Sequence, residues 1–461
     1  MRDEKNNISE EVMKLFYQPS DKPKFSQLIV FAIQQLLAIM AATLVVPVIV
    51  GNGMSPAAAL FGAGAGTLVY VLFTKKKSPV FLGSSFAFLG SMAAAFAGAA
   101  TTAVGYIGLI LGAVFAGLVY VVIAIAVKFA GVEWLNKLMP AVVIGPTVAI
   151  IGLSLAGNAV GDLQKTANAE ANVHLCILVG LVTLFATILC STFGKKMARL
   201  IPFIIGILCG YAVAAVFTVI GVATNNPALQ IINYAAFSAL VEGGVGLHTF
   251  FALPDFTFIT AFGAFGDLTA EYIGTIAVAY IPVAMVVFAE HVADHKNISS
   301  IIEHDLLTDP GLSRTLLGDG IGSMVGAFFG GCPNTTYGES VACVAITGNA
   351  SVATIITTAI GAILISFLSP FVAFVNSIPS CVMGGVCIAL YGFIAVSGLK
   401  MIQKVDLELN NNLFVVSTIL ICGIGGLSVS FGKVTITSIA TALILGIIVN
   451  LMLNNKKKAD K

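Results

Sequence analysis

Charged residues are scarce in this chain of 461 residues: only 10% are Asp, Glu, Lys or Arg, and the net charge is +1. This composition excludes a soluble globular protein, and it provides no basic surface for binding nucleic acid. There is one tryptophan, and the eight cysteines form no CxxC pair and no Cys/His cluster with zinc spacing. We therefore interpret the thiols as structural and expect neither a metal nor a cofactor.

Hydrophobic residues dominate instead, at 58% of the chain, with 47 glycines and a mean hydropathy of +1.00. These values predict an all-α, polytopic membrane protein surrounded by lipid. Residues 1–24 are polar and mixed in charge, and the first apolar run is long enough to span a bilayer, so no cleaved signal peptide is expected. The predicted location is the cytoplasmic membrane, with both termini on the cytoplasmic side.

Apolar runs of spanning length occur twelve times, and two more segments, 80–99 and 332–348, are interrupted by glycine or polar residues. Together they predict fourteen transmembrane segments. The positive-inside rule supports this count. With fourteen spans, all loop lysines and arginines except Lys165 and Lys433 lie on the cytoplasmic side of the membrane. Omitting either broken segment would reverse the side of every later basic loop. The twelve runs are 25–49, 55–73, 102–130, 138–157, 174–193, 200–221, 273–295, 315–330, 351–375, 379–397, 412–430 and 434–453.

The two broken segments also indicate an internal repeat. "SPVFLGSSF" contains Pro79, and "CPNTTYGES" contains Pro333 at the corresponding place. A shift by almost the number of residues that separates these two prolines aligns "VFAIQQLLA" with "VFAEHVADH". In this alignment Gln34 corresponds to Glu290. Each half then has seven spans, and an odd number requires the second half to be inverted relative to the first. A chance alignment of apolar sequence is the alternative.

Broken helices at membrane depth predict a binding cavity, since their unpaired backbone groups must face protein or water. Two interrupted helices that meet near the bilayer midplane form the usual site of an inverted-repeat transporter. "LGSSFAF" and "NTTYGES" are the candidate walls of this site.

Two carboxylates lie deep in apolar sequence, Glu290 in "IPVAMVVFAEHVADH" and Glu339 directly after Gly338. A charge at the bilayer centre costs roughly 2.5–3.5 kcal/mol on insertion scales, so we expect both side chains to face the cavity. The alternative is that each carboxylate only bonds a neighbouring helix and fixes its packing.

Other polar residues near Glu290 are more ambiguous. Asp294 follows Glu290 by four residues and therefore lies on the same face of a helix. Lys296 comes shortly after it, however, so we interpret Asp294 as part of a hydrated helix end on the cytoplasmic side. His295 lies close to the same end. Gln34, which is neutral, lines the site or joins two helices, and its alignment with Glu290 favours the site.

These motifs resemble those of one family, the nucleobase–cation symporters, also called nucleobase–ascorbate transporters, and within it the bacterial uracil permeases. The similarity covers nearly the whole chain and is most specific in "AEH", "LGSSFAF" and "PNTTYGE". It implies fourteen spans in two inverted repeats, with short strands before spans 3 and 10. The implied domains are a cytoplasmic segment 1–24, a core domain 25–130 and 273–375, a gate domain 131–222 and 376–453, an extracytoplasmic loop 223–272, and a cytoplasmic tail 454–461.

The resemblance also implies roles for single residues. Glu290 and Glu339 would accept hydrogen bonds from the ring of a nucleobase, and Phe86 and Gly338 would offer backbone groups. Glu290 would carry the coupled proton. Further implied site residues are Gln34, Tyr337 and Tyr391 as cavity lining, and His295 as a support for Glu339 or a nearby water and as a second proton-coupling group.

The implied function is proton-coupled uptake of uracil by alternating access, carried out by a homodimer in the lipid bilayer. A xanthine or other purine substrate is the alternative, and sodium coupling is less expected because no oxygen-rich cage accompanies the carboxylates. Four positions depart from the family pattern: Gln35, where histidine is usual, Asp294, where the uracil permeases have glycine, and Ser340 and Ala342 after Glu339. Anion transport on a related fold and an ion channel are rival classes. An enzyme is not expected, because no HExxH, GxSxG or paired Asp motif occurs.

Overall fold

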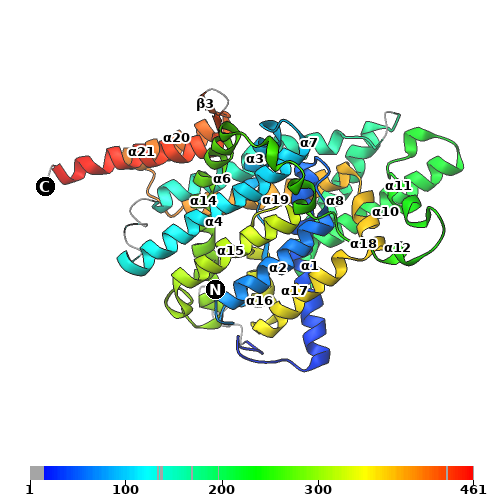
Figure 1. Cartoon of the computed structure of the whole chain (residues 1–461), viewed down its shortest axis with the longest axis horizontal. Helices are drawn as coiled ribbons and strands as arrows, with labels where there is room; N and C mark the ends of the chain where they lie inside the picture. The colour runs from blue at the N-terminus through cyan, green and yellow to red at the C-terminus, as the bar shows by residue number, and fades with distance from the viewer. Residues whose placement is uncertain are drawn as a thin grey trace, which may run out of the picture.

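The computed structural model describes residues 15–131, 134, 139–167, 170–195, 197–431 and 434–459, and these are mostly helical. Several positions used in the predictions lie outside the described residues. They are residues 1–14, the last two residues of the tail, Lys433, and Lys137 and Lys196, two of the loop lysines that the positive-inside rule places on the cytoplasmic side. The helices pack side by side in one body, from which α21 (Ser438–Ala459) projects at one end (Figure 1).

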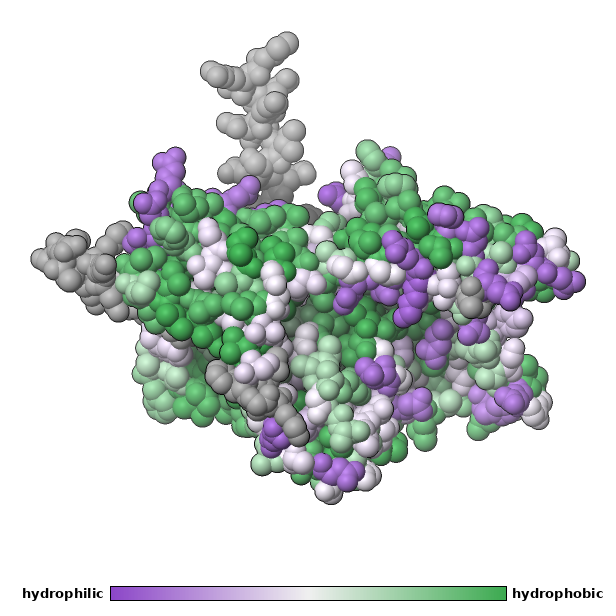
Figure 2. All heavy atoms as spheres, turned by 90° about the horizontal axis from the view of Figure 1, so that it is seen from above, coloured by the Kyte–Doolittle hydropathy of each residue, from purple (hydrophilic) through white to green (hydrophobic). Residues whose placement is uncertain are grey.

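Eight helices in the described ranges are long and apolar enough to cross a bilayer. Large apolar side chains are exposed on their outer faces, for example Val122 and Phe129, and hydrophobic residues cover most of the surface seen in Figure 2. The chain is therefore a multi-pass membrane protein. The eight are α1 (Phe25–Val50), α2 (Pro56–Phe73), α4 (Thr102–Ala130), α6 with α7 (Ala141–Ser154 and Ala156–Gln164), α8 (Val173–Phe193), α10 (Pro202–Ala223), α14 (Ala270–Ile302) and α19 (Ser380–Ile402).

The other six predicted segments contain helices that are shorter or less apolar. Gly, Asp and Ser residues lower the hydropathy of α15 (Leu312–Gly330), which still has the length of a span. The six are η1 with α3 (Phe86–Phe88 and Leu89–Ala97), α15 (Leu312–Gly330), α16 (Gly338–Thr347), α17 (Val352–Ser366), α20 (Asn410–Ile424) and α21.

The boundaries of the long helices follow local sequence signals. Ser55, Thr101 and Thr269 precede α2, α4 and α14, and each side chain accepts a hydrogen bond from a backbone N–H of the first turn. Gly331 ends α15 with a φ of +73°, a conformation that glycine adopts without strain. These caps place the irregular segments of the chain between well-defined helices.

Glycine allows α2 and α15 to pack with their backbones in contact. A Cβ atom added at Gly62 would lie 2.4 Å from the carbonyl oxygen of Gly326, and one added at Gly66 would lie 2.5 Å from that of Gly322. No residue with a side chain fits at such distances. Asn334, just after α15, donates from its Nδ2 to the carbonyl oxygen of Gly62 at 3.1 Å. This close pair therefore fixes the two helices that lead into the broken segments.

Each broken segment forms a short strand that runs into a helix. β1 (Leu82–Ser84) and β2 (Asn334–Thr336) pair in antiparallel register, with Gly83 opposite Thr335 at the centre. Two backbone hydrogen bonds extend the ladder, from Ser85 N to the Pro333 carbonyl oxygen at 2.9 Å and from Tyr337 N to that of Phe81 at 3.1 Å. Each strand thus supplies hydrogen-bond partners to the other in the apolar interior.

The helices pack as two groups. α1 to α4 pack with α14 to α17, while α6 to α10 pack with α19 to α21. Along the boundary, α1 meets α9 (Met197–Leu200) and α10, and α14 meets α6 and α21. Between α10 and α14 lie η2 (Pro227–Leu229), α11 (Ala235–Val241), α12 (Leu247–Phe250), α13 (Thr257–Phe262) and η3 (Phe265–Asp267). The remaining elements are η4 (Leu307–Gly311), α18 (Ser369–Ser377), and the strands β3 (Val429–Phe431) and β4 (Val434–Ile436).

The prediction for Asp294 is wrong. The apolar run 273–295 suggested that this residue ends a span, but α14 continues to Ile302, so Asp294 lies about two turns inside the helix. Thr336 of β2 donates its hydroxyl to Asp294 Oδ2 at 2.8 Å. The side chain is consequently part of the protein interior and is not a hydrated helix terminus.

Candidate functional site

A cavity of about 440 Å³ lies between the two groups of helices. Its lining combines the start of both broken helices with apolar side chains from the second group. The lining includes Ser85, Phe86 and Ala87 of the first broken segment; Thr335, Tyr337, Gly338 and Glu339 of the second; Glu290 and Asp294 of α14; and Arg199 of α9.

Two helix N-termini open into this cavity. η1 begins at Phe86 and α16 begins at Gly338, and neither N-cap residue, Ser85 or Tyr337, makes a side-chain capping hydrogen bond. The first N–H groups of a helix have no partner within the helix, so they are available to an acceptor. A Cβ atom added at Gly338 would have only Asp294 Oδ1 within 4 Å, at 3.8 Å. The space in front of this N-terminus is therefore open.

Three carboxylates line the same cavity. Glu290 and Asp294 are four residues apart on one face of α14, and Glu339 belongs to the first turn of α16. Glu290 is exposed to the cavity, whereas Asp294 and Glu339 are half-buried. Arg199 is the only basic side chain among the described lining residues. The site therefore offers hydrogen-bond acceptors from carboxylates and donors from backbone N–H groups.

Tyr337 joins the two walls. Its hydroxyl donates to the carbonyl oxygen of Ser84 at 2.8 Å, and its ring covers Gly83, where an added Cβ would lie 2.3 Å from the ring carbons. Gly83 is therefore needed for the ring to lie flat against β1. Through this contact the second broken segment is attached to the first.

The other predicted site residues lie just outside the cavity lining. The ring of Tyr391 on α19 contacts the edge of the Phe86 ring, with 6.2 Å between centroids and an angle of 77°. The Oε1 atom of Gln34 and the hydroxyl of Tyr391 are both buried, and neither has a hydrogen-bond partner among the described residues. Tyr391 thus supports the cavity from a second layer through Phe86.

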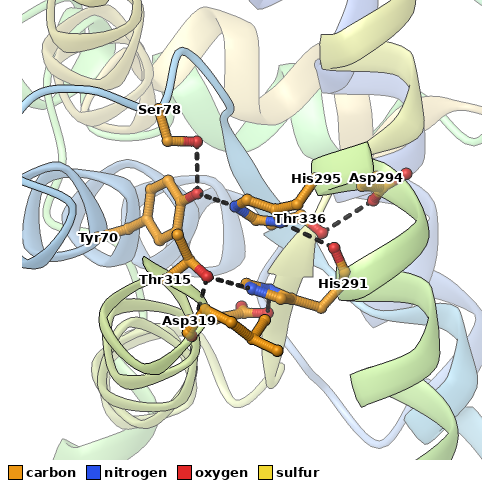
Figure 3. Close-up of polar contacts among 9 residues, drawn as sticks. Tyr70, Ser78, His291, Asp294, His295, Thr315, Asp319 and Thr336 are labelled. Carbon is orange, nitrogen blue, oxygen red and sulfur yellow. Dashed lines mark hydrogen bonds and ion pairs between the residues drawn. The ribbon is translucent and has the colours of Figure 1, made fainter. Parts of the chain in front are cut away.

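His295 is a buried residue of α14 and is not among the residues that line the cavity. Its polar contacts are drawn in Figure 3. Its Nδ1 atom lies 2.8 Å from the carbonyl oxygen of His291, which requires an N–H there, and its Nε2 atom lies 2.6 Å from the hydroxyl of Tyr70. Tyr70 in turn lies 2.6 Å from the Ser78 hydroxyl. Both ring nitrogens are thus engaged by groups other than Glu339, the partner suggested by the resemblance.

A second buried pair joins His291 to Asp319 of α15 (Figure 3). His291 Nε2 lies 3.0 Å from the hydroxyl oxygen of Thr315, which itself donates to the Leu312 carbonyl at 3.1 Å, so Nε2 is the donor. His291 Nδ1 and Asp319 Oδ2, 2.7 Å apart, then share one proton. Asp319 Oδ1 is buried without a hydrogen-bond partner in the described part of the chain.

The sequence indicates that Asp319 has a buried partner or a function, although it is not among the predicted site residues. Like Glu290, it is a single acid inside an apolar run, and such residues in membrane segments usually have a partner or a function. Arg199 and the contact between His291 and Asp319 carried no comparable signal, because they depend on which helices meet.

Solved structures with a similar fold are membrane transporters. The transmembrane domain of a cyanobacterium bicarbonate transporter, BicA, matches with a TM-score of 0.60 at 14% identity, over 94% of this chain and 100% of that chain. The murine anion transporter Slc26a9 in the inward-facing state matches with a TM-score of 0.61 at 11% identity, over 95% of this chain and 69% of that chain. The chain thus has the fold of a membrane transporter domain.

The sequence comparisons define the family. The model of a family described as "Permease family" (Xan_ur_permease) matches residues 26–431. The uracil permease of Bacillus caldolyticus is 38% identical over 443 residues, 95% of both chains, and that of Bacillus subtilis is 37% identical over 435 residues, 93% of both. The chain belongs to this permease family, as the resemblance in its motifs indicated.

Proposed function

We propose that this protein carries uracil across the cytoplasmic membrane and binds it in the cavity between the two groups of helices. The observation that carries the proposal is the arrangement of donors and acceptors in that cavity. Uracil has two ring N–H donors and two carbonyl acceptors, while the cavity presents the carboxylates of Glu290 and Glu339 and the uncapped helix starts at Phe86 and Gly338. The uracil permeases among its relatives support the same substrate.

Each polar edge of the ring has a matching group in this arrangement. Glu290 and Glu339 would accept hydrogen bonds from the ring N–H groups, and the backbone N–H groups at Phe86 and Gly338 would donate to the carbonyl oxygens. Phe86 would lie against the face of the ring, and Tyr391 would support Phe86 from behind. Tyr337 and Gln34 complete the site by fixing its walls.

Proton coupling is the proposed driving force, with Glu290 as the group that carries the proton. Uracil is neutral, so its accumulation needs a second species that moves down its own gradient. Glu290 is the most accessible of the three cavity carboxylates, and no donor among the described residues bonds it. His295 and the neighbouring pair of His291 and Asp319 would stabilise the charge states of α14 from its other side.

Alternating access would come from motion between the two groups of helices, as a core domain and a gate domain in fourteen spans. The proposal includes an inverted repeat, and the antiparallel pairing of β1 and β2, with Gly83 opposite Thr335, supports it. The proposal also includes cytoplasmic termini and a homodimer through the gate domain, which cross-linking in membranes would test.

Binding to the purified protein tests the substrate directly. A ligand that binds only the folded state raises the melting temperature by mass action, so uracil should raise it and xanthine should not. Uptake of labelled uracil into proteoliposomes, competed with unlabelled uracil or xanthine, tests transport. Stabilisation by xanthine but not by uracil would favour a purine carrier, and stabilisation by bicarbonate alone would favour an anion carrier.

A further inference from the structure

Three segments that shape the cavity meet at one buried hydroxyl group, the Oγ atom of Ser340. It accepts a hydrogen bond from the backbone N–H of Phe81 at 2.9 Å and another from the side-chain amide of Gln35. The same Gln35 Nε2 also donates to the backbone carbonyl oxygen of Ser340 at 3.3 Å. We call Gln35, Ser340 and Phe81 the Ser340 junction.

The junction connects both walls of the cavity to a third helix. Ser340 follows Glu339 in the first turn of α16, and Phe81 comes directly before β1, which leads to Phe86. Gln35 belongs to α1, whose Ala38 lines the cavity one turn further along. A displacement at the junction would therefore change the distance between the Glu339 carboxylate and the backbone at Phe86.

The chemistry of the junction requires a small acceptor at its centre. Ser340 is 0% exposed and Gln35 is 3% exposed, so water does not replace a lost hydrogen bond there. A hydroxyl oxygen has two lone pairs and accepts both N–H groups at once. Alanine at this position would leave the Phe81 N–H and one amide hydrogen of Gln35 without partners.

We propose that Gln35 and Ser340 are positioning residues that set the spacing of the two substrate-binding walls and thereby the affinity for the ligand. This inference rests on the proposed function, because the ligand is taken to lie between Glu339 and Phe86. Neither residue touches the cavity, so each acts through the backbone that it holds.

The test compares four forms of the full-length protein: wild type, Ser340→Ala, Gln35→Met and the double variant. Methionine keeps the length of Gln35 without its hydrogen bonds. Isothermal titration with uracil should give a Kd about tenfold higher for Gln35→Met, and at least as high for Ser340→Ala, which also removes the hydrogen bond from the Phe81 N–H. The double variant should bind no more weakly than the weaker single variant, because both changes remove the hydrogen bond between Gln35 and the Ser340 hydroxyl.

Thr358→Ala is the matched control. The Thr358 hydroxyl also bonds α1: it donates to the Ala32 carbonyl oxygen at 3.3 Å and, within its own helix α17, to that of Thr354 at 2.9 Å, without bonding either broken segment. This variant should lower the melting temperature of the ligand-free protein without changing the Kd. Ser340→Cys, which keeps a weaker acceptor of similar shape, should bind with intermediate affinity.

The outcomes separate the two hypotheses. If the wild type does not bind uracil, the proposed function is wrong. If the wild type binds and Ser340→Ala or Gln35→Met binds equally well, the junction does not position the site. Losses that simply add in the double variant, or an equal loss in Thr358→Ala, would show a general effect on packing and would also overturn the inference.

Discussion

Gly83 should be the most sterically restricted position of the site, and Gly83→Ala tests this. An alanine Cβ would lie 2.3 Å from two carbons of the Tyr337 ring, whereas ordinary contacts are longer than 3.4 Å. The ring must therefore move by about an ångström, and such overpacking typically costs about 1–3 kcal/mol. The movement also breaks the hydrogen bond from Tyr337 to Ser84, a further loss of about 1 kcal/mol. We expect the free energy of unfolding to fall by about 2–4 kcal/mol.

Two other glycines provide controls for this prediction. Gly90 on α3 has no neighbouring atom within 4 Å of an added Cβ, so Gly90→Ala should leave stability unchanged or raise it slightly. Gly338 faces the open cavity, so Gly338→Ala should preserve stability but weaken uracil binding by occupying the site. Reversible unfolding in mixed detergent micelles measures the first quantity and titration measures the second. Equal unfolding free energies for Gly83→Ala and Gly90→Ala would refute the steric reasoning.

Three further predictions concern charged groups. Glu290→Gln should keep measurable uracil binding but lose accumulation driven by a pH gradient in proteoliposomes; full accumulation would contradict its proposed role. Asp319→Ala should lower the unfolding free energy by about 3–5 kcal/mol, since it leaves His291 without its buried partner, and a loss below 1 kcal/mol would argue against the shared proton. The hydrogen bond from Lys77 lowers the pKa of Asp309 in the folded protein. This pair therefore stabilises the fold at pH values above the usual Asp pKa, and the stabilisation is lost as the pH falls through the lowered pKa of Asp309. Melting temperatures of wild type and Lys77→Met should therefore differ slightly at pH 7 and converge in acid.

The sequence predicted the parts of the site that depend on local pattern. Polar and glycine residues at 80–99 and 332–348 marked broken helices, and both segments are strand–helix junctions that line the cavity. Glu290 and Glu339 were predicted from the cost of burying a charge, and both carboxylates are in the cavity lining. In each case the signal lay within a few neighbouring residues.

Contacts between distant residues were not predictable in the same way. Gln35 and Ser340 were each noted as departures from the family pattern, but they are 305 positions apart and nothing in the sequence paired them. The structure brings these two departures into direct contact. Asp294 was misplaced because a nearby lysine suggested the end of a helix, whereas α14 continues past this lysine to Ile302.

The close contact between α2 and α15 has a practical consequence for following the transport cycle. Where Gly62 and Gly66 face Gly326 and Gly322, it is formed by glycines and backbone carbonyl groups, so this stretch has no side-chain rotamers that could exchange between two arrangements. Spectroscopic labels on the outer ends of these two helices should keep a constant separation with or without ligand. Such a pair would serve as an internal ruler against which labels on α14 and α19 could report displacement.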